Sequence, residues 1–472
     1  MRETRSQADW LWRTVDVLRG DMTVDAVQKL ILTAVFLRHV SDVPEEAAQG
    51  RPTWQGLVRE VNEFHGIRDS VQRSLRAWSG GYGQLHLDLG LPPSGGREMD
   101  RALRDLVVAL DQAVGETAPR DLYEQCLARF SEDREGGGYY TPRDVVRTLV
   151  ELMAPTPDDE VYDPACGSGG FLVAAAEYVR TRSALPSGDD DHEHEPRLRL
   201  FGQDINAHTR QVAAMNLVIH GLEKDVQRGL TPESSLMHGS ETGGKHDIAL
   251  ANPPFSMRLP DPMDLRFTPW RYGPPPRSNA DFAWVQHVLG SLNAGGRAGI
   301  LLANGAAFRG GAERRIRAGL VHDDVLSSVV QLPPGLFPHT RIPACLWIFS
   351  KAKPASVRKR VLMIDAREAG VPVSRGRRTL SDEYAERILA TFRDWSESGE
   401  VNEPGWCRTI TLEEIEEADF SVLPERHVAP VAEDIEPGGY ERRVRELTED
   451  LYEHFAQAAR LEQELRDALG EW

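Results

Sequence analysis

Residues 247–255 read Asp247-Ile248-Ala249-Leu250-Ala251-Asn252-Pro253-Pro254-Phe255, an apolar run that ends in an Asn-Pro-Pro-Phe sequence. A short apolar run of this kind is typical of a buried strand in a parallel sheet, because both faces of such a strand are covered. Proline cannot continue a hydrogen-bonded ladder, so the strand is expected to end before the two prolines. We therefore predict a strand over 247–251, followed by a rigid loop.

The residue types at 252–255 suit chemistry on an aromatic amine. An exocyclic amine of a nucleobase is a poor nucleophile, because its lone pair is delocalised into the ring. The amide oxygen of Asn252 and the backbone carbonyl of Pro253 can each accept one amine hydrogen, and Pro253 and Pro254 fix the backbone that aims them. Phe255 offers a flat face on which an extruded base can stack. The alternative, from these residues alone, is a proline-rich loop that leaves a strand.

A second motif covers residues 160–172, which read Glu160-Val161-Tyr162-Asp163-Pro164-Ala165-Cys166-Gly167-Ser168-Gly169-Gly170-Phe171-Leu172. The pattern predicts a strand, a glycine-rich turn and the start of a helix. Glycines let a ligand approach the backbone, and a helix N-terminus presents free N–H groups. The spacing to a third glycine does not match the dinucleotide fingerprint. An adenosine ligand with a cationic sulfonium and an amino-acid tail fits this turn better than a pyrophosphate.

A further strand is predicted at residues 198–204, which end in the carboxylate of Asp204. In doubly wound folds an acid at this place binds the ribose hydroxyls. Strand and helix patterns then alternate to about residue 365, as in a parallel α/β sheet, with strands expected at 297–303, 325–332 and 344–350. The glycine-rich turn alone is weak evidence, whereas the turn, the acidic strand end and the Asn-Pro-Pro-Phe sequence in this order are strong together.

From about residue 8 to the C-terminus, the chain resembles the modification (M) subunit of type I restriction-modification systems, an S-adenosylmethionine-dependent adenine-N6 DNA methyltransferase. Besides the two motifs, the likeness is carried by residues 137–143, by 279–284 with 304–311, and by 332–337 with 341–345. The motif order is that of the family's class. The resemblance implies an α/β fold: a Rossmann-like S-adenosylmethionine-dependent methyltransferase domain, an α-helical N-terminal domain and a C-terminal helical tail.

The resemblance also implies the site. The residues expected to bind the cofactor are Gly138, Tyr139, Tyr140, Thr141, Pro142, Arg143, Asp163, Ala165, Gly167, Ser168, Gly169, Gly170 and Asp204. Of these, Asp163 is expected to orient the amino group of the methionine part, directly or through water. Residues 139–143 are expected to close over this part, and Asp204 to accept hydrogen bonds from the ribose hydroxyls. The expected catalytic residues are Asn252, Pro253, Pro254 and Phe255, and no metal site is expected. Residues 232–236 depart from the family, because they lack a clear acidic match for the contact with the cofactor's adenine.

The composition of the chain limits its possible size, cellular location and DNA binding. With 472 residues, of which 40% are hydrophobic, it can form more than one domain and a sizeable core. No apolar run reaches about 18 residues, the start lacks a signal-peptide pattern, and the four cysteines are scattered, which suits the cytoplasm. A net charge of −18 argues against DNA binding by this chain alone, since phosphate contacts normally need a basic surface. The arginine-rich run at 309–317 could line a groove, but taken by itself it is interpreted as a solvated loop.

Three parts are expected along the chain: a helical N-terminal domain at 1–133, a methyltransferase catalytic domain at 134–425, and a C-terminal partner-binding helix at 426–472. Val27, Leu30 and Ile31 illustrate the helical spacing of the first part. In the last part, an apolar stripe predicts a helix that pairs with a partner helix or packs onto its own chain. The resemblance favours contact with a specificity subunit.

Partners also follow from the resemblance. In type I systems a separate specificity (S) subunit reads the DNA sequence, a restriction (R) subunit is present, and two M chains accompany each S chain. The target is an adenine of DNA. An acidic M chain is compatible with this division, because another polypeptide reads the DNA. Three other functions stay open: a methyltransferase of another phage-defence system, a protein-glutamine or RNA methyltransferase, and a non-enzymatic scaffold that keeps a cofactor pocket.

Overall fold

The chain forms two compact units, residues 1–428 and residues 429–472. The computed structural model describes residues 12, 16, 18, 22–63, 66–80, 97–113, 118–130, 141–183, 198–222, 230–231, 235–236, 244–259, 270–337, 342–374, 377–430, 445, 447–449, 451–458 and 460–461. None of the helices in these ranges combines the length and the hydropathy needed to cross a membrane.

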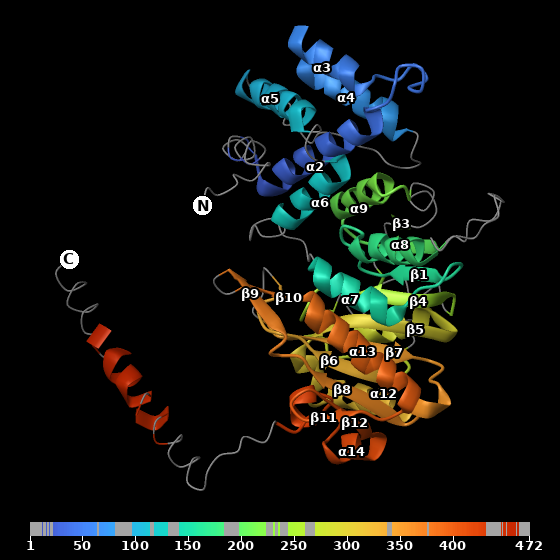
Figure 1. The fold of residues 1–472 in the computed structure, drawn as a ribbon, viewed down its shortest axis with the longest axis vertical. Helices are drawn as coiled ribbons and strands as arrows, with labels where there is room; N and C mark the ends of the chain where they lie inside the picture. The colour runs from blue at the N-terminus through green and yellow to red at the C-terminus, as the bar shows by residue number, and fades with distance from the viewer. Residues whose placement is uncertain are drawn as a thin grey trace. The chain divides into compact units, whose positions relative to one another are not determined.

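The first unit begins with helices. Within the described ranges these are α2 (Val24–Ser41), α3 (Trp54–Glu63), α4 (Ile67–Ser79), α5 (Arg97–Ala113) and α6 (Pro119–Phe130) (Figure 1). Thr23 caps α2, because its side chain accepts a hydrogen bond from the Ala26 N–H. Val27, Leu30 and Ile31 of α2 are fully buried in a core that these helices share. In these described ranges the predicted helical pattern is confirmed, whereas the domain boundary at residue 133 stays a prediction.

A sheet of ten described strands follows, in the order β11-β12-β8-β6-β7-β5-β4-β1-β2-β3. Its strands are β1 (Glu160–Asp163), β2 (Arg199–Gln203), β3 (Leu230–Thr231), β4 (His246–Ala251), β5 (Leu292–Ala303), β6 (Leu326–Gln331), β7 (Ala344–Ser350), β8 (Arg360–Asp365), β11 (Asn402–Glu403) and β12 (Cys407–Thr411). A separate two-stranded sheet consists of β9 (Gly370–Ser374) and β10 (Arg377–Leu380). The helices of this part are α7 (Arg143–Met153), α8 (Gly170–Ser183), α9 (Ala207–Ile219), α11 (Asp281–Ser291), α12 (Ala312–His322), α13 (Asp382–Ser398) and α14 (Leu412–Glu417).

The strands that carry the motifs lie in the parallel half of the sheet. β1 pairs in parallel with β2 and with β4, and β4 pairs in parallel with β5. The predicted motif strands are therefore confirmed, and their carboxyl ends meet at one edge of the sheet. β7 departs from the expected parallel order, because it runs antiparallel between β5 and β6. An apolar pattern does not record direction, since a strand buried on both faces has the same composition either way.

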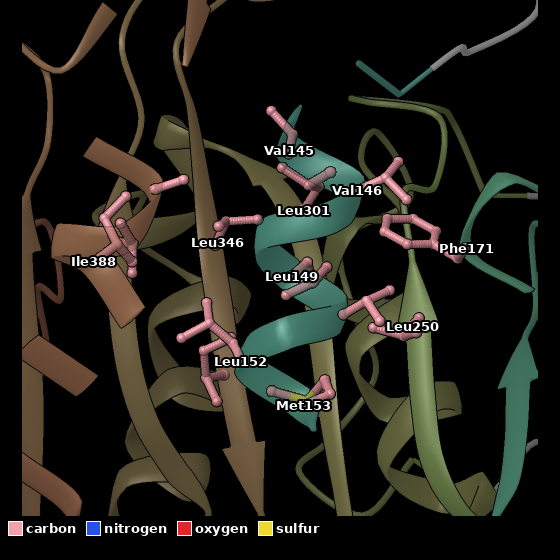
Figure 2. Packing of buried hydrophobic residues seen from close by; sticks show 14 of the residues in the cluster. Val145, Val146, Leu149, Leu152, Met153, Phe171, Leu250, Leu301, Leu346 and Ile388 are labelled. Carbon is pink, nitrogen blue, oxygen red and sulfur yellow. The ribbon is translucent and has the colours of Figure 1, made fainter. Parts of the chain in front are cut away.

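Helix α7 covers the sheet next to the motif strands. Figure 2 shows its residues Leu149 and Leu152 on the side that faces Leu250, Leu301 and Leu346 of β4, β5 and β7. All five side chains belong to one buried cluster. The predicted apolar face of this helix is thus buried, and it fixes the position of the segment that leads into α7.

We expect Gly299→Ala to destabilise this contact. A Cβ at position 299 of β5 would clash with Cδ1 of Leu149 and would lie 3.0 Å from its Cγ, and the Leu149 side chain is fully buried. Overpacking of this kind lowers the free energy of unfolding by about 1–3 kcal/mol. Urea-induced unfolding measures the change. Gly310→Ala is the control, because a Cβ there meets nothing within 4 Å, and equal unfolding midpoints for the two variants would contradict the close packing.

Helix α9 belongs to two cores at once. Figure 1 shows it between α6 and α8. The residues of α9 that pack with the N-terminal helices are Val212, Ala214, Met215, Val218 and Ile219. Ala213 and Leu217, one turn apart, pack instead into the core of the sheet. The Tyr123 hydroxyl of α6 also donates to the Val212 carbonyl at 3.1 Å. Helix α9 therefore joins the N-terminal helices to the sheet.

The second unit contains the predicted C-terminal helix. Its described residues between 445 and 461 are helical. Leu447, Leu451, Phe455 and Leu461 of the predicted apolar stripe are between 51% and 60% exposed. Contact of this stripe with a partner stays a prediction.

Candidate active site

Asn252 directly follows β4 and is 7% exposed. Its Nδ2 donates a hydrogen bond to Thr141 Oγ1 at 2.8 Å, which orients the amide. Its Oδ1 is buried and has no hydrogen-bond partner among the residues that the structure describes. A buried acceptor without a partner costs free energy unless a ligand supplies the donor. The side chain is therefore suited to accept a hydrogen from a bound amine.

Phe255, the aromatic residue of the motif, packs against a second aromatic ring. The rings of Phe255 and Phe337 lie 5.8 Å apart between centroids, with 79° between their planes. Edge-to-face pairs of this kind stabilise the orientation of both rings. Phe337 ends the segment 332–337, so the structure brings this segment to the motif although the two are far apart in the sequence.

The backbone after the motif is held by Asp281, the first residue of α11. The Ser256 N–H donates to Asp281 Oδ1 at 3.2 Å, and the Ala280 N–H donates to the Met257 carbonyl at 2.8 Å. Ser256 has a φ of 55°, a left-handed conformation that is costly for a residue other than glycine. Asp281 therefore positions the loop of residues 252–257, without itself lining the cavity described below.

An ion-pair network surrounds Asp281, which is 1% exposed. Arg309 Nη2 donates to Asp281 Oδ2 at 2.5 Å, and Arg309 Nε donates to Glu313 Oε2 at 2.6 Å. Arg317 is also 1% exposed and donates to two backbone carbonyls. The interpretation of 309–317 as a solvated loop is therefore wrong. A run of arginines in a sequence does not reveal the carboxylates and carbonyls that enclose it.

The glycine-rich turn joins β1 to α8, as predicted. The Ala165 N–H donates to Asp163 Oδ1 at 3.0 Å, and the Gly167 N–H donates to Asp204 Oδ2 at 3.2 Å. Gly169 has a φ of +81°, which only glycine adopts without strain. The turn thereby holds the carboxylates of Asp163 and Asp204 at the adjacent ends of β1 and β2.

Both carboxylates lie in an environment that disfavours their charge. Burial, and to a smaller extent the charge of Asp204, raise the pKa of Asp163 to about 8, although the bond from the Ala165 N–H acts in the opposite direction. Burial also raises the pKa of Asp204. A positively charged ligand would favour the ionised forms again. The pair therefore fits a cationic ligand.

We expect Asp163→Asn to stabilise the ligand-free protein increasingly as the pH rises. The pKa of Asp163 is about 8 in the folded protein and about 3.9 in an unfolded chain. The folded wild type therefore loses stability between about pH 4 and pH 8, and asparagine escapes this loss. The difference in melting temperature should be small at pH 4.5 and largest above pH 8. A difference that shrinks with rising pH, or one that appears equally in the exposed control Asp394→Asn, would contradict this cause.

A cavity of about 1020 Å³ opens at this edge of the sheet. The predicted site residues that line it are Thr141, Pro142, Arg143, Asp163, Ala165, Ser168, Gly170 and Asn252. The predicted site residues that the structure describes but that do not line it are Gly167, Gly169, Asp204, Pro253, Pro254 and Phe255. Gly138, Tyr139 and Tyr140 lie outside the described residues, as do residues 232–234. The cavity thus brings the turn, the start of α7 and Asn252 together.

Three residues near the site were not singled out by the sequence. Asp281 was included in the segment 279–284, but its position in the sequence does not indicate a contact with the Asn-Pro-Pro-Phe loop. The Asn216 side chain of α9 donates to the Ser168 carbonyl at 2.9 Å and lines the cavity. Ser235 donates to the Pro164 carbonyl at 2.6 Å, which ties the segment after β3 to the turn. In the sequence, Asn216 could have been recognised as a polar residue within the apolar stretch 212–219.

Described residues offer no group of three or more histidine, cysteine or carboxylate side chains that could hold a metal ion. The four cysteines are free and buried. Burial raises the pKa of the Cys166 thiol well above its usual range. Cys166 in the turn is therefore an unreactive thiol, because the thiolate is the nucleophilic form.

Comparison with known proteins places these features in a family. The model of the N-6 DNA Methylase family matches residues 118–435. The type I restriction enzyme HindI methylase subunit of Haemophilus influenzae is 33% identical over 354 residues, which cover 74% of this chain and 77% of that protein. The type I restriction enzyme MjaIX methylase subunit of Methanocaldococcus jannaschii is 32% identical over 365 residues, 74% of this chain and 62% of that protein.

A solved structure shows the same fold. The type I restriction-modification methyltransferase subunit from Streptococcus thermophilus aligns with a TM-score of 0.74 and 22% identity, over 90% of this chain and 99% of that one. The predicted fold class is confirmed. The family match itself includes the glycine-rich turn and the Asn-Pro-Pro-Phe loop. The chain belongs to the N-6 DNA methylase family, as a methylase subunit of the type I restriction-modification group.

Proposed function

We propose that the cavity at the end of β4 binds S-adenosylmethionine, and that Asn252 presents the N6 amine of a flipped adenine for methylation. The observation that carries this proposal is the buried Oδ1 of Asn252, which lacks a partner in the described chain and belongs to a cavity that Asp163 also lines. Asp163 would receive the amino group of the cofactor, and Asp204 its ribose hydroxyls. Bound in this way, the cofactor supplies an electrophilic methyl group on a sulfonium.

The residues of the loop act on the adenine. Asn252 Oδ1 and the Pro253 carbonyl accept the two amine hydrogens, which draws the nitrogen lone pair out of the ring. Pro254 keeps the loop rigid, and Phe255 stacks on the base, whose extrusion costs a few kcal/mol. With the amine held by Asn252 and Pro253, its nitrogen would take the methyl group from the sulfonium as the carbon–sulfur bond breaks, and the extra proton of the amine would pass to solvent. The rate enhancement would come mainly from two effects. The amine nitrogen is held about 3–3.5 Å from the methyl carbon, and the two hydrogen-bond acceptors are already in place before the base arrives.

The chain would work with an S subunit and an R subunit in the cytoplasm, with two M chains for each S chain. The relatives from H. influenzae and M. jannaschii are named as methylase subunits of type I restriction enzymes, which supports an assembly. The net charge of −18 also favours a separate polypeptide that contributes to DNA binding. The exposed apolar stripe of the C-terminal helix is the surface that we assign to the S subunit.

Transfer of label from S-adenosylmethionine to adenine-containing duplex DNA tests the proposal, with the chain alone and with its co-expressed S subunit. We expect N6-methyladenine at one specific site, and only when the S subunit is present. Transfer by the lone chain to protein or RNA would assign a different substrate. The absence of transfer in every combination would contradict methylation at this site.

A further inference from the structure

Glu124 of α6 brings the N-terminal helices to the cavity, where it is a lining residue together with Ser168. One of its carboxylate oxygens pairs with Arg143 at the start of α7. The other lies 2.9 Å from His220 Nε2. Burial alone would raise the pKa of Glu124, but the hydrogen bond to His220 and the charge of Arg143 lower it overall, so the carboxylate is ionised. It can therefore hold both partners at once.

His220 continues the connection into α9. Its Nδ1 lies 2.8 Å from the Asn216 carbonyl, and its side chain has no exposed surface. The Asn216 side chain donates from Nδ2 to the Ser168 carbonyl in the glycine-rich turn. A continuous path of polar contacts therefore runs from Arg143 through Glu124, His220 and Asn216 to Ser168.

Asn216 has a second property that points to a ligand. Its Oδ1 is buried and has no partner within the described part of the chain, and the residue lines the same cavity. The Ser168 carbonyl can only accept, so it fixes which end of the amide carries the Nδ2 donor. The oxygen that stays without a partner is an acceptor for an N–H or O–H donor of a bound molecule.

We propose that Glu124 couples the docking of the N-terminal helices to cofactor binding, with Asn216 as a further cofactor-binding residue whose Oδ1 accepts from the ligand's ammonium group. This inference rests on the proposed binding of S-adenosylmethionine at the turn. Two separate cofactor segments, residues 141–143 and 163–170, are linked to the one carboxylate on α6. Gly169 of the turn also packs closely on Ala213 of α9. A Cβ added at position 169 would lie 3.5 Å from the Cβ of Ala213. A shift of α6 would therefore be transmitted to both segments.

Glu124→Gln tests the coupling, because glutamine keeps the size of the side chain but removes the negative charge that forms the ion pair with Arg143. We expect the Kd for S-adenosylmethionine, measured by calorimetry, to rise about tenfold, within the range typical of coupled sites. At saturating cofactor, kcat in the presence of the S subunit should stay within about twofold of the wild type. Asp121→Asn, an exposed acid on the same helix, should leave both quantities unchanged.

A double variant distinguishes coupling from general damage. Glu124→Gln and Asn216→Ala should together raise the Kd by less than the product of their separate effects, since both interrupt the same path. Independent effects, or a Glu124→Gln protein that binds the cofactor as tightly as the wild type, would overturn the proposal. A wild-type chain that does not bind S-adenosylmethionine would instead contradict the proposed function.

Hydrogen exchange of the wild type gives a test that needs no variant. Coupling is reciprocal, so a cofactor that binds better to the docked state must also favour docking. Amides of α6 should therefore exchange more slowly when S-adenosylmethionine is added, whereas those of α14 should not change. Unchanged exchange in α6, with binding shown by calorimetry in the same sample, would refute the coupling.

Discussion

Asn252→Ala is expected to slow methyl transfer to DNA by at least a factor of about 100 to 1000, while the Kd for S-adenosylmethionine stays within about twofold. The side chain provides one of two acceptors aimed at the amine, and its Oδ1 already lies buried in place before any base arrives. Alanine removes this acceptor and the bond to Thr141 Oγ1. A preorganised polar group of this kind acts mainly on the transition state.

Single-turnover transfer and calorimetry on the same preparations separate these two effects. Asn402→Ala is the control, because Asn402 is an exposed asparagine on β11 at the far edge of the sheet. It should transfer methyl groups at the wild-type rate. An Asn252→Ala protein that loses cofactor binding, or one that keeps its transfer rate, would contradict the assigned division between Asn252 and the turn.

Asp281→Ala is expected to lower both stability and rate. Removal of one member of a buried ion pair leaves the other charge uncompensated, which commonly costs 3–5 kcal/mol. We expect about 3 kcal/mol, at the lower end of that range, because Arg309 keeps Glu313 as a partner. The Ser256 N–H also loses its acceptor, so the loop that carries Asn252 is released from its left-handed turn. Transfer should slow by about tenfold to a hundredfold at saturating cofactor, as expected for lost orientation.

Denaturant unfolding and kcat measure the two effects of Asp281→Ala. Asp105→Ala breaks a pair with Arg101 at 4.0 Å that is exposed on both sides, and it should change the free energy of unfolding by less than about 1 kcal/mol. Asp281→Glu keeps the charge with a longer reach and should recover part of the stability. If Asp281→Ala unfolded like the Asp105 variant and retained its rate, Asp281 would not position the loop.

The sequence predicted the parts of the site that are contiguous in the chain. The strand before Asn252, the turn at 163–170 and the acid at Asp204 each follow from residue type and spacing within a dozen residues. Their meeting at one sheet edge follows from the parallel pairing of β1, β2 and β4. The resemblance added a cofactor role for the segment that leads into α7, where Thr141 contacts Asn252.

Contacts between distant segments were not predictable from spacing. Asp281 reaches Ser256 across 25 positions, and Glu124 reaches His220 across 96. The packing of the folded chain determines which of these residues meet. Their residue types alone do not identify them, because similar charged residues occur on the surface of most proteins. The arginines at 309 and 317 show the same limit, because Arg309 pairs with Asp281 and the buried Arg317 donates to backbone carbonyls of other segments. The antiparallel direction of β7 has no signature in composition either.

The sharing of α9 between two cores restricts how this polypeptide can be divided. A recombinant fragment that began near residue 134 would leave Val212, Met215 and Val218 of α9 facing water instead of α2 and α6. Each such side chain loses about 1.5–3 kcal/mol of burial, and contiguous apolar patches promote aggregation. Two products from separate helical and catalytic reading frames would each expose the apolar surface that α9 shares with the N-terminal helices, so we expect co-expression to improve the yield of both.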